Sequence, residues 1–362
     1  MGKKKIMVAF GTRPEAIKMA PLVHQLLEEP NQFDVLICVT GQHREMLDQV
    51  LKVFEITPDI DLNVMRQNQD LFDVTSSILL GMREVFAKYQ PDIVLVHGDT
   101  TTTMATAIAA FYSGVQVGHV EAGLRDHSKE RPEEKNRILT DNLSDLMFCP
   151  TPGAYKNLQK ESKNINMGNF YFTGDVMRDI FIQSKDKFSC PEGVTEKNQD
   201  FCLFTLHRQE NVDNKENLIQ ISKGINKLSK KLTVYFPMHP RTEKMCKKFN
   251  VEFNCVPLKP LNYFEFQWMI EHAKLVITDS GGVQKETFFH GKKSLLIYSG
   301  KSGWEELQNI QAIVLVEAKE NSIVTKAHKI LENNSIDISE IGNFFGDGNA
   351  ANKIVQIACS EL

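Results

Sequence analysis

The length, composition and charge of the chain exclude several classes of protein. A chain of 362 residues is too long for one ordinary hydrophobic core, so we expect two domains. The hydrophobic content of 42% and the charged content of 24% are typical of a globular protein. A net charge of −4 gives no general attraction for nucleic acid or acidic membranes. We therefore expect neither as a partner, and expect any anionic ligand to bind in a local pocket.

Cysteine usage and the N-terminal residues bear on the cellular compartment. The seven cysteines are an odd number and contain no CxxC pair, which argues against a disulfide framework and a zinc site, and we expect no metal. The basic start is followed by an apolar run, Ile6–Phe10, that is far too short for a signal peptide. No stretch approaches the length of a membrane span. We expect a soluble protein of the reducing cytoplasm.

Short apolar runs alternate with helical patterns in the first half of the chain. The predicted strands are Lys5–Phe10, Phe33–Val39, Ile93–Val96, Val115–Val120, Leu146–Cys149 and Phe170–Gly174. The predicted helices are the one that follows Gly11-Thr12-Arg13-Pro14, then Met46–Phe54, Asp70–Tyr89, Met104–Tyr112, Asn136–Ser144, Ala154–Lys160 and Asp175–Gln183. In the longest of them the residues expected on the buried side include Leu71 and Met82. This alternation predicts a parallel, doubly wound α/β sheet.

The alternation starts again after a polar connection at residues 184–200. The predicted strands are Phe201–Leu206, Thr233–Phe236, Leu275–Thr278, Ser294–Tyr298 and Ala312–Val316. The predicted helices are Asn217–Lys230, Phe264–His272, Val283–Phe289, Ile323–Leu331 and Ala350–Ser360. We expect two Rossmann-like domains, 1–170 and 171–345, whose parallel sheets face a cleft. A C-terminal helix within 346–362 could pack back on the first domain.

Acidic residues follow two neighbouring apolar runs of the first half. Asp99 comes soon after the predicted strand Ile93–Val96, and Glu121 directly follows Val115–Val120. Ligands of parallel sheets gather at the carboxyl ends of the strands, so both side chains should face one crevice. Glu133 follows in Arg131-Pro132-Glu133-Glu134. Several acids at one rim are useful for proton chemistry, and we predict an active site there.

Two glycine-containing turns at helix N-termini are candidate anion sites. The first, Gly11-Thr12-Arg13, should present bare backbone N–H groups beside an arginine, although an ordinary turn with a surface arginine explains it equally well. The second, Ser280-Gly281-Gly282, lets phosphate oxygens approach backbone N–H groups at the start of a helix. Glu286, one turn later, is placed to accept hydrogen bonds from ribose hydroxyls. The alternative is a serine-capped helix that follows a tight turn.

His207, at the end of a predicted strand and followed by Arg208, could offer a proton or an ion pair to a leaving phosphate. A lone histidine is more often structural or merely exposed. No Walker loop, nucleophile elbow, metal-ligand cluster or hydride-cofactor site is visible. Carboxylates together with phosphate-binding turns favour chemistry on an activated sugar or nucleotide.

Seven motifs then suggest a family. They are, in order, GTRPEAIKMAP, TGQHREMLDQVLKVF, VLVHGDTTTT, GHVEAGLR, PEEKNR, LHRQEN and TDSGGVQKE. In this order they resemble those of the non-hydrolysing UDP-N-acetylglucosamine 2-epimerases, and the resemblance covers nearly the whole chain. It implies a glycosyltransferase-B-type architecture of two Rossmann-like domains, a homodimer, and a UDP-sugar substrate bound in the cleft without a cofactor.

The resemblance also implies a mechanism. A base removes the C2 proton of the sugar while UDP leaves from C1, 2-acetamidoglucal forms, and UDP adds back as a proton returns to the other face of C2. Two faces require at least two acid–base groups. The residues implied are Asp99, Glu121, Glu133 and His207 for catalysis, and Arg13, Arg137, Ser280, Gly281, Gly282 and Glu286 for substrate binding. The acids carry proton transfer, His207 and Arg13 steady the diphosphate, and which carboxylate is the base stays open.

Departures from the family pattern leave alternatives open. The chain reads HSKERPEE where many members read YSPWPEE, and Lys301–Glu306 lacks the arginine of the family's TERPE segment. A 2-epimerase of a modified UDP-HexNAc, a 6-deoxy or diacetamido sugar, therefore stays open. Gln209 replaces a second arginine and leaves open whether the allosteric UDP-sugar site of some relatives exists. A hydrolysing epimerase, a UDP-sugar glycosyltransferase and a catalytically silent sensor rank lower, because GTRPE and the retained acids fit them less well.

Overall fold

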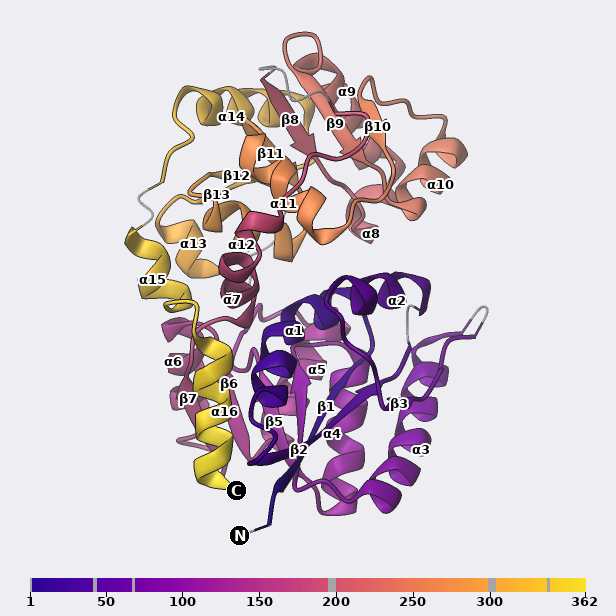
Figure 1. The fold of residues 1–362 in the computed structure, drawn as a ribbon. Helices are drawn as coiled ribbons and strands as arrows, with labels where there is room; N and C mark the ends of the chain where they lie inside the picture. The colour runs from indigo at the N-terminus through magenta and orange to yellow at the C-terminus, as the bar shows by residue number, and fades with distance from the viewer. Residues whose placement is uncertain (1, 42–43, 67–68, 195–199, 299–303, 337–338) are drawn as a thin grey trace. The chain divides into compact units, whose positions relative to one another are not determined.

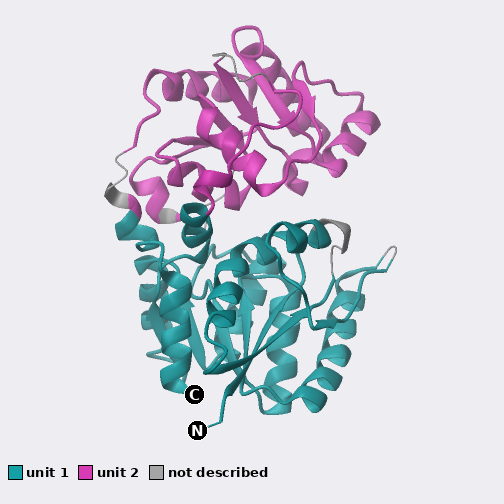
Figure 2. Ribbon diagram, viewed as in Figure 1, with its two compact units in different colours: residues 1–183, 342–362 teal, residues 184–341 magenta. Residues whose placement is uncertain are grey.

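The computed structural model describes residues 2–41, 44–66, 69–194, 200–298, 304–336 and 339–362. The chain forms two compact units, coloured separately in Figure 2. Unit 1 contains Met1–Gln183 and Gly342–Leu362, and unit 2 contains Ser184–Ile341. Half of the segment that departs from the family's TERPE pattern, residues 301–303 of 301–306, lies outside the described residues.

Unit 1 is built on a sheet of seven parallel strands in the order β3-β2-β1-β4-β5-β6-β7 (Figure 1). The strands are β1 (Lys4–Phe10), β2 (Phe33–Val39), β3 (Ile60–Asp61), β4 (Ile93–His97), β5 (Gln116–Val120), β6 (Leu146–Cys149) and β7 (Asn169–Phe172). The chain moves outward from β1 to β3 and returns to β4. Ligands of open parallel sheets bind outside the carboxyl ends of the strands at such a reversal, which places the ends of β1, β4 and β5 at the expected binding edge.

Helices pack on both faces of this sheet and bury its apolar strands. They are α1 (Arg13–Leu27), α2 (Arg44–Val53), α3 (Leu71–Tyr89), α4 (Thr101–Ser113), α5 (Pro132–Leu143), α6 (Pro152–Glu161), α7 (Val176–Gln183) and α16 (Ala350–Glu361). A further helix, α15 (Ser339–Phe345), contains the point at which the chain passes from unit 2 to unit 1. All five residues of β4 are buried, as expected for a central strand covered on both faces. Met82 of α3 is buried as predicted, but Leu71 is 51% exposed. Its predicted burial was wrong because the apolar stripe of α3 begins one turn later.

The C-terminal helix belongs to unit 1. α16 packs against α1 and α7, and the buried carboxylate of Asp179 accepts hydrogen bonds from the N–H groups of Ala350, at 3.1 Å, and Ala351, at 2.7 Å. These bonds satisfy donors of the first turn of α16 that have no partner within the helix. Residues 171–183, which the sequence pattern assigned to the second domain, lie in unit 1.

Unit 2 contains a second sheet, of six parallel strands in the order β10-β9-β8-β11-β12-β13. The strands are β8 (Phe201–Phe204), β9 (Thr233–Pro237), β10 (Val256–Leu258), β11 (Leu275–Thr278), β12 (Ser294–Ile297) and β13 (Ile313–Val316). The α-helices are α8 (Gln209–Val212), α9 (Lys215–Leu228), α10 (Pro240–Phe249), α11 (Tyr263–His272), α12 (Gly281–Phe289), α13 (Glu305–Asn309) and α14 (Glu320–Glu332). The prediction of two parallel α/β sheets is confirmed.

Several short elements were not predicted. β3 has two residues and β10 has three, which is too short for a hydrophobic period to be visible. α10 has the sequence PRTEKMCKKF, and its buried residues are Thr242, Met245 and Cys246. This narrow apolar side gave no clear helical pattern after Pro240. Within the described ranges, none of the helices combines the length and apolar character that crossing a membrane requires.

Candidate active site

Two of the three predicted acids of unit 1 follow adjacent strands. β4 and β5 pair in parallel, with His97 opposite Val120, so the residues after them emerge at the same edge. Gly98 has φ +69° and Glu121 has φ +70°, a left-handed conformation that is uncommon for a glutamate and typical of functional sites. A Cβ atom on Gly98 would lie 3.4 Å from Oε1 of Glu121. The Glu121 side chain therefore lies against the turn that carries Asp99.

Glu121 is paired with a lysine that the sequence pattern did not single out. The ammonium nitrogen of Lys18, on α1, donates to Oε2 at 2.9 Å and to Oε1 at 3.2 Å. Nε2 of the buried His97 lies 3.8 Å from Oε2. A nearby cation stabilises the ionised form of a carboxylate. The available signal for Lys18 was its place in GTRPEAIK, one turn beyond the predicted anion site.

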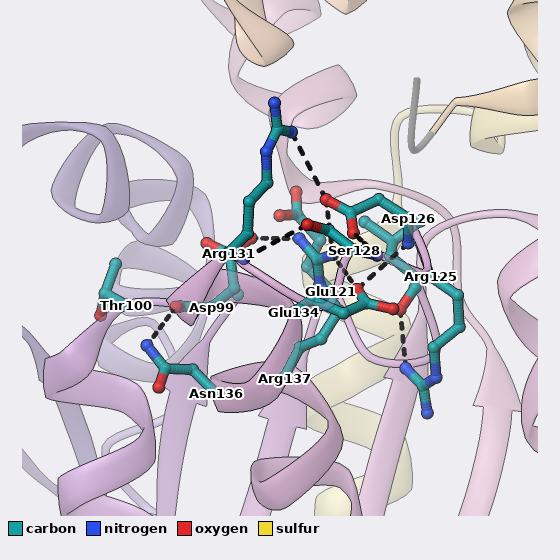
Figure 3. A network of polar contacts seen from close by, with 12 residues as sticks. Asp99, Thr100, Glu121, Arg125, Asp126, Ser128, Arg131, Glu134, Asn136 and Arg137 are labelled. Carbon is teal, nitrogen blue, oxygen red and sulfur yellow. Dashed lines mark hydrogen bonds and ion pairs between the residues drawn. The ribbon is translucent and has the colours of Figure 1, made fainter. Parts of the chain in front are cut away.

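Asp99 is held by two consecutive residues of α5. Arg137 donates to Oδ2 of Asp99, and the side-chain amide of Asn136 donates to its backbone oxygen at 3.0 Å. Arg137 also donates to Oε2 of Glu134 at 2.6 Å. Its guanidinium thus bridges two carboxylates (Figure 3). The structure brings the predicted residues Asp99, Glu121 and Arg137 to one rim of unit 1.

The two glutamates of the PEE motif have different surroundings. α5 begins at Pro132, four residues earlier than predicted, so both lie in its first turn. Glu133 is exposed, whereas Glu134 is buried. Glu134 accepts hydrogen bonds from the backbone N–H groups of Asp126, at 3.1 Å, and His127, at 2.8 Å. Burial alone would raise the pKa of Glu134, but these N–H groups and Arg137 hold it below its ordinary value.

The turn after β1 is not the bare anion site that the sequence predicted. The N–H groups of Gly11, at 3.1 Å, and Thr12, at 2.8 Å, donate to Oε2 of Glu15. Thr12 and Glu15 form a capping box at the start of α1, and Thr100 donates to the other oxygen of Glu15 at 2.7 Å. The prediction of bare N–H groups is wrong, because a carboxylate of the same helix already binds them. Arg13 is half-buried at the first position of α1, and its role in diphosphate binding stays a prediction.

At the second predicted turn, the serine does not cap the helix that follows. Ser280 precedes α12, but its side chain makes no capping hydrogen bond to the helix. Its backbone N–H donates to Oγ1 of Thr278 at 2.9 Å. A Cβ atom on Gly281 would lie 3.7 Å from Nη2 of Arg208, so a guanidinium lies beside the turn. Backbone donors of a first helical turn next to an arginine can bind an anion, and this favours the phosphate interpretation over a serine cap.

His207 is oriented by a buried aspartate. Its Nδ1 lies 3.1 Å from Oδ1 of Asp279, while the side chain remains 41% exposed. The Asp279 carboxylate also accepts from the backbone N–H groups of His207, at 3.0 Å, and Arg208, at 2.8 Å, and from Nδ2 of Asn211 at 3.1 Å. Burial would raise the pKa of Asp279, but His207 and these donors hold it below its ordinary value. An ionised Asp279 favours the tautomer with the proton on Nδ1 of His207, which leaves Nε2 to accept a proton.

Glu286, the predicted ribose ligand, lies one turn into α12 and is 8% exposed. Its Oε1 accepts a hydrogen bond from Nε2 of the fully buried Gln267 at 2.9 Å. Oε1 of Gln267 lies 3.0 Å from Nε2 of His290. The amide of Gln267 therefore turns its N–H group towards Glu286. The sequence pattern did not single out Gln267 either, because no motif contains it.

The chemistry that these residues can perform differs between the units. The rim of unit 1 combines carboxylates with paired cations, which suits proton transfer. Unit 2 combines a histidine, an arginine and a helix N-terminus, which suits an anionic leaving group. Within the described part of the chain, no group of three or more histidine, cysteine, aspartate or glutamate side chains is placed to hold a metal ion.

Comparison with known proteins identifies the family. A family described as UDP-N-acetylglucosamine 2-epimerase matches residues 25–358. The UDP-N-acetylglucosamine 2-epimerases of Campylobacter jejuni and Bacillus subtilis are each 39% identical to this chain, and the matches cover 98% of it and 97% and 95% of those proteins.

Solved structures agree with the sequence comparison. The structure of the UDP-GlcNAc 2-epimerase from Neisseria meningitidis bound to UDP-GlcNAc has a TM-score of 0.88 at 34% identity, covering 98% of this chain and all of that one. The Methanocaldococcus jannaschii enzyme in complex with UDP-GlcNAc and UDP has a TM-score of 0.87 at 32% identity, covering 98% and 99%. The glycotransferase of kitacinnamycin, with a TM-score of 0.59 at 9% identity, covers the whole of this chain and 98% of that one and shares the fold alone. The predicted resemblance is confirmed: the chain belongs to the UDP-N-acetylglucosamine 2-epimerase family.

Proposed function

We propose that this protein interconverts UDP-N-acetylglucosamine and UDP-N-acetylmannosamine by epimerisation at C2. The observation that carries the proposal is the position of Asp99 and Glu121 at the ends of adjacent strands, each beside a cation. Family membership supports the same activity, because the Neisseria meningitidis relative of similar fold is bound to UDP-GlcNAc.

In this proposal unit 2 binds the UDP group. The Ser280-Gly281-Gly282 turn cradles the diphosphate with the backbone N–H groups of α12, and Glu286 accepts hydrogen bonds from the ribose. His207 meets the negative charge that develops on the leaving diphosphate. The buried Asp279 holds the ring in place, with its Oδ1 3.1 Å from Nδ1 of His207. The guanidinium of Arg13 also stabilises the negative charge of the leaving diphosphate.

The acids of unit 1 carry the chemistry at C2. One carboxylate takes the C2 proton, the electron pair of that C–H bond forms the C1–C2 double bond of 2-acetamidoglucal, and the pair of the C1–O bond leaves with UDP. In the return step UDP adds to C1 and C2 receives a proton on its other face. Two faces need two acid–base groups. Asp99, Glu121 and the exposed Glu133 are the candidates, and Arg137 holds Asp99 in place.

A close alternative is epimerisation of a modified UDP-HexNAc, a 6-deoxy or diacetamido sugar. The segment at 301–303, where the chain departs from the family pattern, lies outside the described residues. The choice between the two sugars therefore depends on a substrate comparison. A hydrolysing epimerase ranks lower because the start of such enzymes usually reads differently from GTRPE. A glycosyltransferase ranks lower because it would not need the acids proposed near C2.

We also propose a cytoplasmic homodimer. The helices α3 and α4 pack side by side in unit 1 and present exposed large hydrophobic side chains. These are Leu71, Phe72 and Leu80 on α3 and Phe111 and Tyr112 on α4. Exposed apolar side chains on two neighbouring helices favour contact with a second chain. Light scattering should give about twice the chain mass of 41.1 kDa, and a value equal to the chain mass would contradict the dimer.

One incubation tests the activity. The protein is mixed with UDP-GlcNAc in D₂O, and the C2 proton is followed by NMR. We expect the C2 proton signal to disappear and UDP-ManNAc to form without free ManNAc. Release of free ManNAc would indicate the hydrolysing reaction. Binding without exchange would indicate a sensor, and exchange that appears only with a 6-deoxy or diacetamido substrate would establish the alternative sugar.

A further inference from the structure

His119 is a fully buried histidine of β5, two residues before Glu121. Its Nδ1 lies 2.6 Å from Oδ1 of Asp141 on α5, and its Nε2 lies 2.7 Å from the backbone oxygen of Gly98. Both are distances of strong hydrogen bonds. The ring therefore joins α5 to the turn that follows β4.

Both partners of the ring are acceptors. A peptide oxygen can only accept a hydrogen bond. Asp141 also accepts from Nη1 of Arg125 at 2.7 Å and from the N–H group of Gly123 at 3.2 Å. Burial alone would raise the pKa of Asp141, but His119 and Arg125 hold it below its ordinary value. A neutral imidazole carries one N–H group and can serve one of these two acceptors, whereas an imidazolium serves both.

The charges around His119 also favour its imidazolium form. Arg125 makes a two-pronged ion pair with Glu161 of α6, with Nε and Nη2 at 2.8 and 2.6 Å from the carboxylate. The guanidinium and the carboxylates of Glu161 and Asp141 together carry one net negative charge. A positive His119 makes the cluster neutral, and burial makes an unbalanced charge costly.

This cluster fixes the turns that carry the two candidate acids. Gly98 directly precedes Asp99, and its N–H group donates to the oxygen of Val120 at 2.9 Å. Asp141 contacts residues on both sides of Glu121, namely His119 before it and Gly123 after it. A change in this cluster would therefore move one carboxylate relative to the other.

We propose that His119 is an imidazolium that positions the acids for the C2 chemistry, by binding the Gly98 oxygen and Asp141 at the same time. His119 does not touch the substrate and acts through the turns of Asp99 and Glu121. The inference rests on the proposed function, because the separation of the two acids matters only if both reach one carbon. A displacement of about 1 Å in such an arrangement can cost about 100-fold in rate.

The protonation state is tested on the unmodified protein, without substrate. The ten histidines are labelled with ¹⁵N, and the ring signals of His119 are assigned by their absence in His119→Gln. At pH 8, above the ordinary histidine pKa of about 6.5, we expect protons on both ring nitrogens of His119. A single protonated nitrogen on His119 would overturn the proposal. If the variant does not fold, the same signal is assigned by the contact of its ring with the Gly98 segment.

The positioning role is tested by kinetics. In His119→Gln we expect kcat for UDP-GlcNAc to fall about 100-fold, with KM and the affinity for UDP within about threefold of the wild-type values. The matched control is His24→Gln on α1, since the His24 ring contacts the backbone oxygen of Phe54 at 2.9 Å, and its kcat should be unchanged. Unchanged kcat in His119→Gln, or a loss confined to KM, would refute positioning. A wild-type protein without turnover would contradict the proposed function, and the NMR result would still decide the state of His119.

Discussion

The ammonium nitrogen of Lys18 lies 2.9 Å from Oε2 of Glu121, so that the first helix supplies the cation for the acid at the end of β5. Both side chains are largely buried, with exposed fractions of 16% and 9%, and solvent ions screen such a pair weakly. Arg137 makes the corresponding contact with Asp99 (Figure 3). Two acids at one rim thus have different cations, which is consistent with different roles in the reaction.

Replacement of Lys18 by methionine should slow catalysis more than binding. Without the ammonium group the largely buried Glu121 carboxylate loses the donor of two hydrogen bonds, at 2.9 and 3.2 Å. Loss of a hydrogen bond to a charged group corresponds to about a 10- to 100-fold fall in kcat. The rate of C2 deuterium exchange measures this. Lys52→Met, at an exposed position of α2, is the control, and equal rates in both variants would contradict the role of the pair.

Replacement of Asp99 by asparagine should abolish turnover while the fold is retained. The amide keeps the shape of the side chain and removes its ability to take a proton. UDP affinity, measured by calorimetry, should stay within about threefold, because the residues assigned to UDP lie mainly in unit 2. Asp34→Asn on β2, an exposed position, controls for the charge change. Near-normal C2 exchange in Asp99→Asn would remove Asp99 from the catalytic set.

The strands and the first two acids were accessible from the sequence because each depends on local pattern. Buried parallel strands are continuous apolar runs, and Asp99 and Glu121 are the first acids after two such runs. The pairing of Glu121 with Lys18 was not accessible, because the partners are 103 residues apart and meet only when β1 and β4 become neighbours in the sheet. His119 was missed because a histidine inside an apolar run is indistinguishable from a packed core residue.

Two of the sequence predictions were wrong because they misjudged how a helix begins. The turn at Gly11 was predicted to present bare N–H groups, but Glu15 at the third position of α1 binds them. The start of α5 was placed at Asn136, whereas the helix begins at Pro132. The residue at which a helix begins decides which of its side chains face inwards. In α5 the start at Pro132 leaves Glu133 exposed and Glu134 buried. Sequence patterns locate helix ends poorly, because capping depends on side chains that can be recruited from either side of the boundary.

Asp279 predicts a pH-dependent contribution to the stability of unit 2. Its pKa in the folded protein lies below its ordinary value of 3.8, so the stabilisation is fully present above that pH. It is lost as the pH falls through the lower folded value. Asp279→Asn should therefore reduce the free energy of unfolding by about 2 kcal/mol at pH 7, and the difference from wild type should shrink below pH 4. Urea unfolding at several pH values measures it, and a difference that grows on acidification would contradict this assignment.

Substitution of Glu133 and of Glu134 should have different effects, the first on turnover and the second on stability. Glu133→Gln changes an exposed side chain, so the free energy of unfolding should stay within about 0.5 kcal/mol, while turnover falls if Glu133 transfers a proton at C2. Glu134→Gln removes the charge that accepts from Asp126, His127 and Arg137. This should cost about 2 kcal/mol of stability, with a part of the loss disappearing at low pH, because the folded pKa of Glu134 is lowered.

The two glutamates are neighbours of identical chemistry, so each variant is the control of the other. Urea unfolding and C2 deuterium exchange are measured on both. A stable Glu133→Gln without turnover, beside a less stable Glu134→Gln that retains part of its activity, would support the assignment. The reverse pattern, with Glu133→Gln fully active and Glu134→Gln stable but inactive, would transfer the proton-transfer role to Glu134. The ion pair of Arg137 with Asp99 and Glu134 would then link the two acids of the reaction directly, since one guanidinium could exchange its hydrogen bonds between them as the proton moves.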